Sequence, residues 1–425
     1  MGTFRKAQQK TVWVAIDVAK ARHEALVELP NGSRRRTSIA NTLAGFKRFA
    51  DELRRSGKNC EIALEPTGDY HRPIANFLLR QGHKVHFVSS IATCRTREAL
   101  YNSWDKNDPK DAQVILHLLK TGTTQIFSDP LERGYHDLRE LLGAYRQIVS
   151  QKTKIYHSLM THYLPLYFPE AECFIASSRS EWFLDVFRFA PCPTAVLKYT
   201  KATFIKKTVK NAGHPTVRRK LVGEYYETAK QSAGLPIEAD SLTIQMFQAV
   251  LDEYIRLAQR RRLLEKQLHE HLEPHADYQR LRTIPGIGPI VALTVMAEAG
   301  DVRRFSRYRK FLNYCGLSLS TSQSGSYRGA SQLSKRGNAR LRSAFWMAGR
   351  AAIAQRRNGF RKKYDDYMRE NPLDGDLKRK AYTAVAAKMA RVAYGLIKTE
   401  TDYRHFLQAA IPAGESLRSV PLRQA

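Results

Sequence analysis

Between residues 11 and 125, short apolar runs alternate with segments of helical periodicity, and this order constrains the fold more than any other feature. The first three runs are joined by short connections, one of them an Asn31-Gly32 turn, and predict an antiparallel meander. Helical segments separate the later runs, as in a layered α/β domain. The expected strands cover residues 11–16, 23–29, 37–40, 60–64 and 84–88, and the expected helices residues 43–53 and 73–80.

The rest of the chain is predicted to be mainly helical. Residues 135–163 and 242–272 keep a 3.6-residue apolar period on either side of an irregular, basic, proline-containing insert at about 164–240. This pattern favours either a coiled-coil-like hairpin or a plain helical bundle. An Ile-Pro-Gly-Ile-Gly turn at 284–288 is typical of a helix-hairpin-helix element. Further helices are expected at 290–299, 307–314, 339–354 and 381–398.

These patterns predict an α/β + α protein of three folded parts. The α/β domain would occupy residues 1–125, a long-helix region residues 126–275, and a mainly helical unit residues 276–400, followed by a flexible tail at 401–425. The five cysteines form no C-x-x-C pair and no zinc-type spacing, so we expect reduced thiols without a shared task.

The charge balance limits the partners of such a protein. The chain has 70 Lys and Arg against 40 Asp and Glu, a formal net charge of +30, which indicates a polyanion and most commonly a nucleic acid. A membrane surface is the competing interpretation, but no apolar run is long enough to span a bilayer. Because the first ten residues also lack the apolar stretch of a signal peptide, we expect a soluble, cytoplasmic, nucleoid-associated protein.

Acidic residues stand at the ends of two predicted strands and at one predicted helix start. Asp17 follows the first strand and Glu65 the fourth, while Asp108 and Asp111 lie at the beginning of a helix. Taken singly, each is an ordinary turn or capping residue. Together they are arranged as in ribonuclease H-like nucleases, where converging carboxylates repel one another unless divalent cations bind. Hard oxygen ligands favour Mg²⁺ or Mn²⁺, so we expect a two-metal site for phosphodiester chemistry.

Two blocks of motifs carry a resemblance to a known family. The first contains IDVAK at 16–20, LEPTG at 64–68 and NDPKDA at 107–112; the second contains IPGIG at 284–288, SG at 324–325 and LSKRGNARLR at 333–342. In this order they resemble the DEDD transposases of bacterial insertion sequences, a group that includes Piv-like DNA invertases and bridge-RNA-guided recombinases. The resemblance implies a RuvC-like N-terminal domain and a C-terminal transposase domain. The chain departs from it at Asn107, where Thr is usual, and in its large insert.

The resemblance also implies a protein nucleophile. From composition alone, residues 318–326 are a flexible serine-rich loop. Members of the family carry a serine before a glycine here, which maps onto Ser324, although a small shift of alignment would select Ser322 or Ser326. Attack by a serine conserves the energy of the phosphodiester bond in a covalent phosphoserine, as strand exchange requires. The resemblance further implies a homodimer or homotetramer in which the DEDD site of one protomer faces the serine of another.

Glycines and basic residues of the second block are the expected contacts to nucleic acid. Glycine lets backbone N–H groups approach a phosphate, and basic side chains around a helix start clamp phosphates, although a solvated basic helix start is the alternative. Further basic fields at 198–220 and 260–262 fit backbone contacts, and the relatives imply that part of this charge holds a structured guide RNA. The expected contacts are Gly286, Gly288, Lys335, Arg336, Asn338, Arg340 and Arg342.

These expectations combine into one function with two alternatives. The main interpretation is a transposase or recombinase of an insertion sequence, which cleaves and exchanges donor and target DNA through a phosphoserine at Ser324, under the guidance of a non-coding RNA. The first alternative is a Holliday-junction-type endonuclease that uses the same carboxylates and water. The second is a non-catalytic nucleic-acid-binding protein whose acidic residues are structural.

Overall fold

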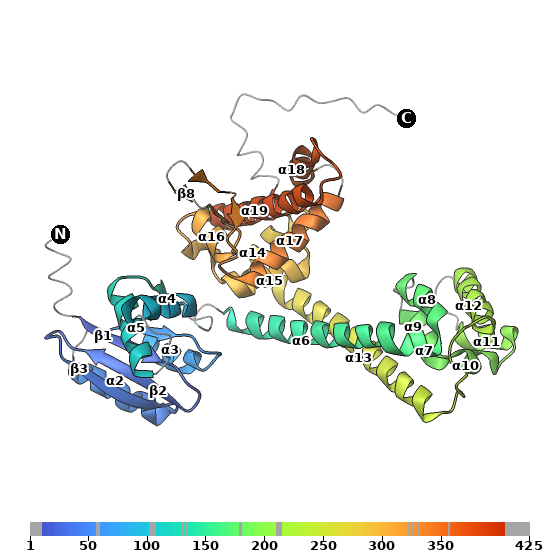
Figure 1. Ribbon diagram of the computed structural model, residues 1–425, viewed down its shortest axis with the longest axis horizontal. Helices are drawn as coiled ribbons and strands as arrows, with labels where there is room; N and C mark the ends of the chain where they lie inside the picture. The colour runs from blue at the N-terminus through green and yellow to red at the C-terminus, as the bar shows by residue number, and fades with distance from the viewer. Residues whose placement is uncertain are drawn as a thin grey trace. The chain divides into compact units, whose positions relative to one another are not determined.

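The computed structural model describes residues 11–56, 60–101, 108–128, 131, 134–177, 181–209, 215–321, 323–324, 327–329, 331–355 and 358–403; at 108–109, 176–177, 181, 215, 323–324 and 327–328 it describes the backbone alone. The chain divides into two compact units, Met1–Pro130 (unit 1) and Leu131–Ala425 (unit 2) (Figure 1).

Unit 1 is built around one six-stranded sheet. Its strands are β1 (Val12–Asp17), β2 (Arg22–Glu28), β3 (Arg34–Ala40), β4 (Cys60–Glu65), β5 (Lys84–Phe87) and β6 (Gln125–Ile126), in the spatial order β3-β2-β1-β4-β5-β6. The predicted meander is confirmed, because β1, β2 and β3 pair antiparallel. β4 and β5 run parallel to β1, and the short β6, which the sequence did not predict, is antiparallel to β5.

Helices cover both faces of this sheet, since both faces are apolar. They are α2 (Leu43–Ser56), α3 (His71–Arg80), α4 (Ser90–Tyr101) and α5 (Asp108–Lys120). Phe49 of α2 and Leu78 of α3 pack in the core on one face. On the other face, Ala112 of α5 shares a core with Ala15 and Ala63. The layered α/β class expected from the sequence is therefore confirmed; α4 was not predicted, because it has no apolar stripe.

Two long helices run antiparallel, side by side, in unit 2 (Figure 1). They are α6 (His136–Ser158), which continues through a π-helical turn, η1 (Leu159–Tyr163), and α13 (Leu242–Leu272). The hydroxyl of Tyr145 donates to Glu265 at 2.9 Å, and the ring centroids of Tyr156 and Tyr254 lie 6.2 Å apart. The two predicted helices are confirmed, and coiled-coil packing between them stays a prediction.

The segment between these helices is folded, not irregular as predicted. We call residues 164–240 the insert lobe. Tyr225 lies at its centre, fully buried, and donates its hydroxyl to the carbonyl of Ala190 at 2.7 Å. The ring centroids of Phe168, Phe183 and Phe204 lie 5.1, 5.5 and 6.3 Å from that of Tyr225. Packing of this kind gives the lobe an aromatic core, which it shares with Leu159 of η1 and with Phe247 and Leu251 of α13.

Prolines explain why the sequence pattern of the insert lobe was misread. The helices are α7 (Leu164–Tyr167), η2 (Pro169–Ala171), α8 (Glu172–Ser177), α9 (Glu181–Phe189), α10 (Pro193–Leu197), α11 (Lys201–Thr208) and α12 (Pro215–Lys230). Pro169, Pro193 and Pro215 each stand at the first position of one of these elements. Proline is well tolerated there because the first helical N–H has no partner to lose. These three prolines therefore begin helices and do not mark loops.

The C-terminal lobe (residues 276–403) is mainly helical and shares a core with one end of α6 and α13. The predicted turn joins α14 to α15, and the remaining predicted helices are confirmed with shifted ends; α18 was not predicted. The elements are α14 (Ala276–Arg282), α15 (Pro289–Ala299), η3 (Val302–Arg304), α16 (Tyr308–Tyr314), α17 (Ala339–Ala354), α18 (Gly359–Met368) and α19 (Gly375–Thr399), with β7 (Leu319–Ser320), β8 (Gln323–Ser324), β9 (Tyr327–Arg328) and β10 (Gln332–Leu333).

The structure also bears on the cysteines and on the apolar character of the helices. All five cysteines are free thiols, in agreement with their spacing. Among the described helices, none combines the length and the apolar character that a bilayer crossing requires. Of the flexible tail predicted at 401–425, the first residues pack on the C-terminal lobe, where Tyr403 is buried, and residues 404–425 lie outside the described residues.

Candidate functional site

Asp17 and Glu65 are direct neighbours at the carboxyl ends of two parallel strands. They are paired in the register of β1 and β4. Side chains alternate along a strand, so Asp17 points to the same face as Ala15, and Glu65 to the same face as Ala63. Because both alanines lie in the core beneath α5, the two carboxylates emerge on the face that α5 covers. The structure thus brings together two residues that are far apart in the sequence.

A third carboxylate, which the sequence did not single out, lies in the same row. Glu24 of β2 is paired with Asp17 in the antiparallel register of β1 and β2. Its Oε1 accepts a hydrogen bond from Ser38 Oγ at 2.6 Å. Like charges directly opposite one another in a sheet are destabilising. Asp17 therefore stands between Glu24 and Glu65, where a bound cation would relieve the repulsion; only the strand register could reveal this.

Asp111 lies in the first turns of α5 and is only 2% exposed. Arg97 of α4, another residue that the sequence did not single out, forms an ion pair with it, with 2.5 Å between Nη2 and Oδ1. Even so, Asp111 Oδ1 and Arg97 Nε have no hydrogen-bond partner among the described residues. Asp108 begins α5, but its side chain lies outside the described residues. Asp111 is therefore a buried oxygen donor balanced by one arginine.

This donor set fits a hard divalent cation. Asp17 and Glu65 offer neighbouring carboxylates, and Asp111 offers a buried carboxylate whose charge one arginine balances. Among the described side chains, no three His, Cys, Asp or Glu residues lie close enough together to define a metal centre. The convergence of all four predicted carboxylates stays a prediction.

Ser324 lies in a β-ladder and not in the flexible loop expected for residues 318–326. It ends β8 and is paired with Tyr327 of β9, while β7 pairs with β10. The described parts of this segment are thus held by backbone hydrogen bonds at the surface of the C-terminal lobe. The side chain of Ser324, together with Ser322 and Ser326, lies outside the described residues.

The two glycines of the predicted helix-hairpin-helix turn have different environments. Gly286 has φ +87°, and a Cβ there would lie 2.3 Å from the carbonyl oxygen of Ala348 in α17. Its glycine requirement is therefore explained by close packing of the turn on α17. Gly288, the N-cap of α15, has φ −85°, and a Cβ there would meet no atom within 4 Å. Phosphate contacts by either residue stay predictions, and Gly288 has the open side that such a contact needs.

Gly286→Ala is expected to lower the free energy of unfolding of unit 2 by about 2–3 kcal/mol, because it combines a strained φ with a steric overlap. Gly288→Ala is the matched control and is expected to change it by less than about 1 kcal/mol. Urea unfolding followed by far-UV circular dichroism measures both. Equal effects of the two substitutions would contradict the packing role of Gly286.

Two of the predicted nucleic-acid contacts are engaged within the protein. Asn338 caps α17, accepting from the backbone N–H groups of Arg340 and Leu341, and its Nδ2 donates to Glu298 at 2.7 Å. Arg340 and Arg146 also donate to Glu298, at 3.0 and 2.7 Å. Burial alone would raise the pKa of Glu298, but these donors outweigh it and lower that pKa. Glu298 thus joins α6, α15 and α17.

The other three basic contacts lie before and at the start of α17. Lys335 and Arg336 are exposed, and Lys335 has the positive φ of +56°. Arg342 is half-buried and donates from Nη1 to the carbonyl of Lys335 at 2.9 Å. Lys335 and Arg336 therefore present their charge to solvent at one helix start, which suits a phosphate contact, and this role stays a prediction.

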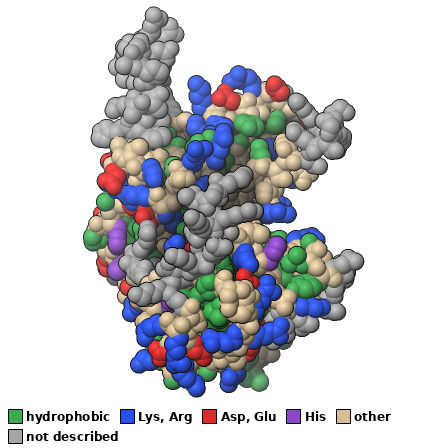
Figure 2. All heavy atoms as spheres, turned by 90° about the vertical axis from the view of Figure 1, so that its left-hand side faces the viewer, with side chains coloured by type: hydrophobic (Ala, Val, Ile, Leu, Met, Phe, Trp, Pro, Cys, Tyr) green, Lys and Arg blue, Asp and Glu red, His purple; other side chains and the backbone are tan. Residues whose placement is uncertain are grey.

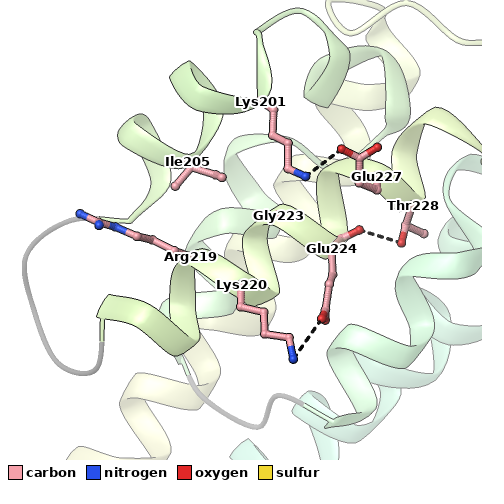
Figure 3. A pocket seen from close by; sticks show the side chains of 8 residues that line it. All are labelled: Lys201, Ile205, Arg219, Lys220, Gly223, Glu224, Glu227 and Thr228. Atoms are coloured by element: carbon pink, nitrogen blue, oxygen red, sulfur yellow. Dashed lines mark hydrogen bonds and ion pairs between the residues drawn. The ribbon is translucent and has the colours of Figure 1, made fainter.

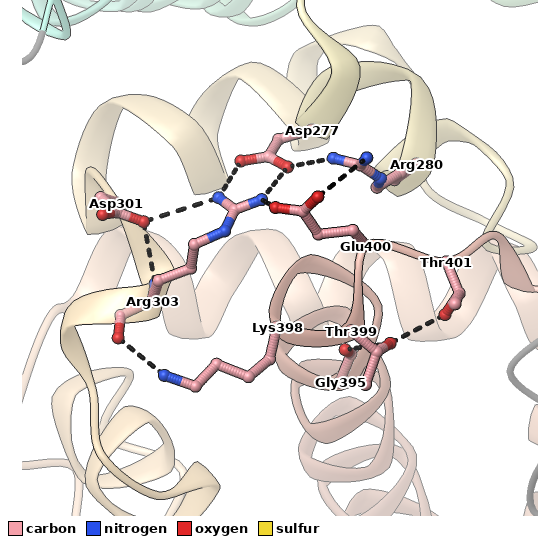
Figure 4. A network of polar contacts seen from close by, with 9 residues as sticks. All are labelled: Asp277, Arg280, Asp301, Arg303, Gly395, Lys398, Thr399, Glu400 and Thr401. Carbon is pink, nitrogen blue, oxygen red and sulfur yellow. Dashed lines mark hydrogen bonds and ion pairs between the residues drawn. The ribbon is translucent and has the colours of Figure 1, made fainter.

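A polar network anchors the hairpin element to the C-terminal end of α19 (Figure 4). Arg303 of η3 donates to both oxygens of Asp277 in α14, at 2.7 and 3.0 Å, and to Glu400 at 3.0 Å. Arg280 also donates to Asp277, at 2.9 Å. Burial alone would raise the pKa of Asp277, but Arg303 and then Arg280 outweigh it and lower that pKa below its ordinary value of 3.8.

Unit 2 is expected to lose stability in acid through Asp277 and Glu298. A carboxylate with a lowered pKa in the folded state stabilises the fold fully above its ordinary pKa, and this contribution disappears as the pH falls through the lower, folded value. The melting temperature should therefore fall below about pH 4, and Asp277→Asn with Glu298→Gln should flatten this dependence while lowering stability at pH 7. Glu270→Gln, at an exposed position of α13, is the control and should leave the pH profile unchanged.

Lys and Arg side chains are spread widely over the face shown in Figure 2. In the insert lobe, Lys201, Arg219 and Lys220 line a pocket of about 530 Å³ between α11 and α12. Glutamates partly balance it, since Lys201 Nζ lies 2.8 Å from Glu227, and Lys220 Nζ lies 4.0 Å from Glu224 (Figure 3). The basic field at 198–220 is therefore less positive locally than its lysines suggest.

Comparison with known proteins places both motif blocks in one family. A model of the DEDD transposases of IS110 type matches residues 14–169, and a model described as Transposase IS116/IS110/IS902 family matches residues 278–365. A probable family 20 transposase of Pseudomonas aeruginosa is 34% identical over 38% of this chain and 47% of its own length. The transposase for insertion sequence element IS1111A of Coxiella burnetii is 30% identical over 40% of this chain and 47% of its own length.

One similar protein extends over nearly the whole chain. An uncharacterized 43.6 kDa protein of insertion element IS110, from Streptomyces coelicolor, is 22% identical over 96% of this chain and 98% of its own length. By contrast, the chain spans about half the length of the Pseudomonas and Coxiella relatives.

Proposed function

This chain belongs to the IS116/IS110/IS902 family of DEDD transposases, and from that premise we propose that it is the DNA transposase of an insertion sequence, a metal-dependent enzyme that cleaves and exchanges donor and target strands. The observation that carries the proposal is the in-register pair Asp17 and Glu65 at the ends of β1 and β4, beneath the helix that carries Asp111. Acidic residues in this arrangement serve phosphodiester chemistry.

We assign unit 1 to the RuvC-like, ribonuclease H-like fold. The strand order β3-β2-β1-β4-β5, an antiparallel meander followed by parallel strands with helices on both faces, supports this assignment. The carboxylates would hold Mg²⁺ or Mn²⁺, which when bound supplies positive charge to the scissile phosphate and lowers the pKa of a coordinated oxygen. The protein itself holds Asp17 and Glu65 at one edge of the sheet and keeps Asp111 buried from water.

Strand cleavage would proceed by attack of Ser324 Oγ on a DNA phosphorus. The bond from phosphorus to one deoxyribose oxygen breaks, that oxygen leaves as a hydroxyl, and a phosphoserine forms. Attack by a DNA hydroxyl on the phosphoserine reverses these changes and rejoins the strand without an energy source. The pairing of the Ser324 backbone with Tyr327 in a β-ladder supports a defined place for this residue in the chain.

The partners follow from the same proposal. Donor and target DNA are the substrates, and a structured non-coding RNA is the proposed guide, in keeping with the net charge of +30. The DEDD site of one protomer would meet Ser324 of another in a homodimer or homotetramer. Action on chromosomal DNA would place the protein with the nucleoid, in the cytoplasm.

The experiment incubates the full chain with donor DNA, target DNA, RNA and Mg²⁺, and then denatures the mixture. A covalent DNA–protein adduct is expected, and it should disappear in Ser324→Ala but persist in Ser320→Ala, a matched exposed serine of β7. Loss of the adduct in Ser322→Ala or Ser326→Ala alone would move the nucleophile to that residue.

The same experiment separates the alternatives. Cleaved DNA without an adduct would identify a metal-dependent junction endonuclease, and binding without cleavage would identify a non-catalytic nucleic-acid-binding protein. Recombination that survives ribonuclease treatment of the complex would contradict the guide RNA.

A further inference from the structure

A groove of about 610 Å³ lies between α18 and α19 in the C-terminal lobe. Its walls carry four cationic side chains, Lys362 and Lys363 from α18, and Lys388 and Arg391 from α19. None of them was among the contacts predicted from the sequence. They come from two helices that the chain brings together by packing, so the cluster is invisible in any single stretch of sequence.

The positive charge of this groove is not balanced locally. Its wall contains one acid, Asp366, which pairs with Arg369 at 2.5 Å. Within the part of the chain that the structure describes, none of the four groove cations forms an ion pair with a carboxylate. The pocket of the insert lobe differs in this respect, since Lys201 and Lys220 have glutamate partners there (Figure 3). An exposed groove with unbalanced cations attracts anions.

Lys388 is held in position at this groove. Its Nζ donates to the carbonyl of Gly359 at 2.7 Å and lies 5.7 Å from the ring centroid of Phe360. Burial and then the neighbouring charges of Lys363, Arg391 and Lys362 lower the pKa of Lys388, and the charge of Asp366 offsets them only in part. An ammonium group has three N–H donors, and one hydrogen bond is found among the described residues. The fold thus holds the positive charges of the groove close together, and the Lys388 ammonium group has N–H donors left for a ligand.

Exposed aromatic rings accompany two of the cations. The Nζ of Lys363 lies 5.6 Å from the ring centroid of Tyr367, which is 40% exposed. Arg391 lies close to Tyr308, which is 38% exposed, and after Arg309 it contributes to lowering the pKa of that tyrosine. Cations interleaved with exposed aromatic rings suit a nucleic acid, because the cations contact phosphates while the rings stack on bases or sugars.

We propose that the groove between α18 and α19 binds backbone phosphates of a nucleic acid, with Lys362, Lys363, Lys388 and Arg391 as the donors. The proposed function identifies the polyanion as nucleic acid, and the groove adds a binding site apart from the carboxylates and Ser324. DNA and RNA share this phosphate chemistry, and the experiment distinguishes them.

The first test measures binding of the full chain to fluorescein-labelled duplex DNA, single-stranded DNA and an RNA hairpin, in EDTA, over a range of KCl concentrations. The groove variant K362Q/K363Q/R391Q keeps the half-buried Lys388 and is compared with K378Q/R379Q/K380Q, which removes three exposed cations of α19 outside the groove. We expect the groove variant to weaken binding about tenfold or more and to reduce the slope of log K against log salt by about 1–2, because each phosphate contact contributes about 0.7–0.9.

The outcomes of this comparison are decisive. In the control variant, the slope of log K against log salt is expected to fall by less than half as much as in the groove variant. The probe whose binding the groove variant weakens most identifies DNA or RNA as the ligand. Equal losses in the two variants, or unchanged binding in the groove variant, would overturn the proposal. Thermal melting by circular dichroism checks that both variants are folded.

A second test uses the unaltered protein. Lysine acetylation by an N-hydroxysuccinimide ester, read by mass spectrometry, should slow at Lys362, Lys363 and Lys388 when the nucleic-acid probe is bound, and should continue at Lys378 and Lys380. Acetylation of the groove lysines at unchanged rates would also overturn the proposal. Neither test requires DNA cleavage, so failure of the Ser324 chemistry would leave both results intact.

Discussion

Asp17→Asn is expected to lower DNA strand cleavage by about 10³-fold or more, equivalent to about 4 kcal/mol of transition-state stabilisation. The residue stands between Glu24 and Glu65 in adjacent strands, so its charge is central to the carboxylate row. Cleavage of labelled donor DNA in Mg²⁺ measures the effect on activity.

A second readout separates loss of metal from loss of folding. Mn²⁺ is expected to raise the melting temperature of the unaltered protein, and this increase should disappear in Asp17→Asn. Glu24→Gln is the matched control from the same row. Because Ser38 already holds the Glu24 carboxylate, we expect less than about tenfold loss of activity there. Full activity in Asp17→Asn would rule out the metal site proposed for unit 1.

Arg97→Met is expected to lower the stability of unit 1 by about 3–5 kcal/mol, because it leaves the Asp111 carboxylate buried without its cation. The side chains of Arg97 and Asp111 are only 12% and 2% exposed, so water cannot replace the lost interaction. Hydrogen exchange of the β1 and β4 amides measures the change where it matters, in the strands that carry Asp17 and Glu65.

Two further variants test whether this effect belongs to the ion pair. Asp111→Asn added to Arg97→Met should recover most of the lost stability, since no charge then remains buried. Arg95→Gln removes a neighbouring arginine of α4 whose partner is Glu98, and its side chain is 76% exposed. It should change stability by less than about 1 kcal/mol. A small effect of Arg97→Met, similar to that of Arg95→Gln, would show that Asp111 does not depend on the arginine.

The arginine has a consequence for metal binding. Arg97 supplies one positive charge to a carboxylate that the proposed function assigns to a divalent cation. The guanidinium can therefore hold the Asp111 carboxylate in place when no metal is bound. Mg²⁺ or Mn²⁺ should accordingly restore part of the stability that Arg97→Met loses, because a cation near Asp111 replaces the missing charge.

Local patterns in the sequence were enough to predict most of the strands and long helices. They were also enough to place two of the four candidate carboxylates, Asp17 and Glu65, at strand ends. Short apolar runs predicted the strands that end in Asp17 and Glu65, and both residues lie at the carboxyl ends of those strands. Helical periods predicted α6, α13 and α17, since an apolar stripe must face a core. By contrast, α4 was missed because it buries only Thr93 and has no stripe.

What the sequence alone determined about this protein is the order of its main strands and long helices, its family and the two acidic strand ends, because these depend on residues that are near one another in the chain. The tertiary structure decided which distant residues become neighbours. It placed Glu24 beside Asp17, paired Arg97 with Asp111, and formed the cationic groove from α18 and α19. It also gave the insert lobe its aromatic core. Strand register and helix packing are long-range contacts, so no local pattern contains them, and the balance of charge around each carboxylate and lysine depends on them.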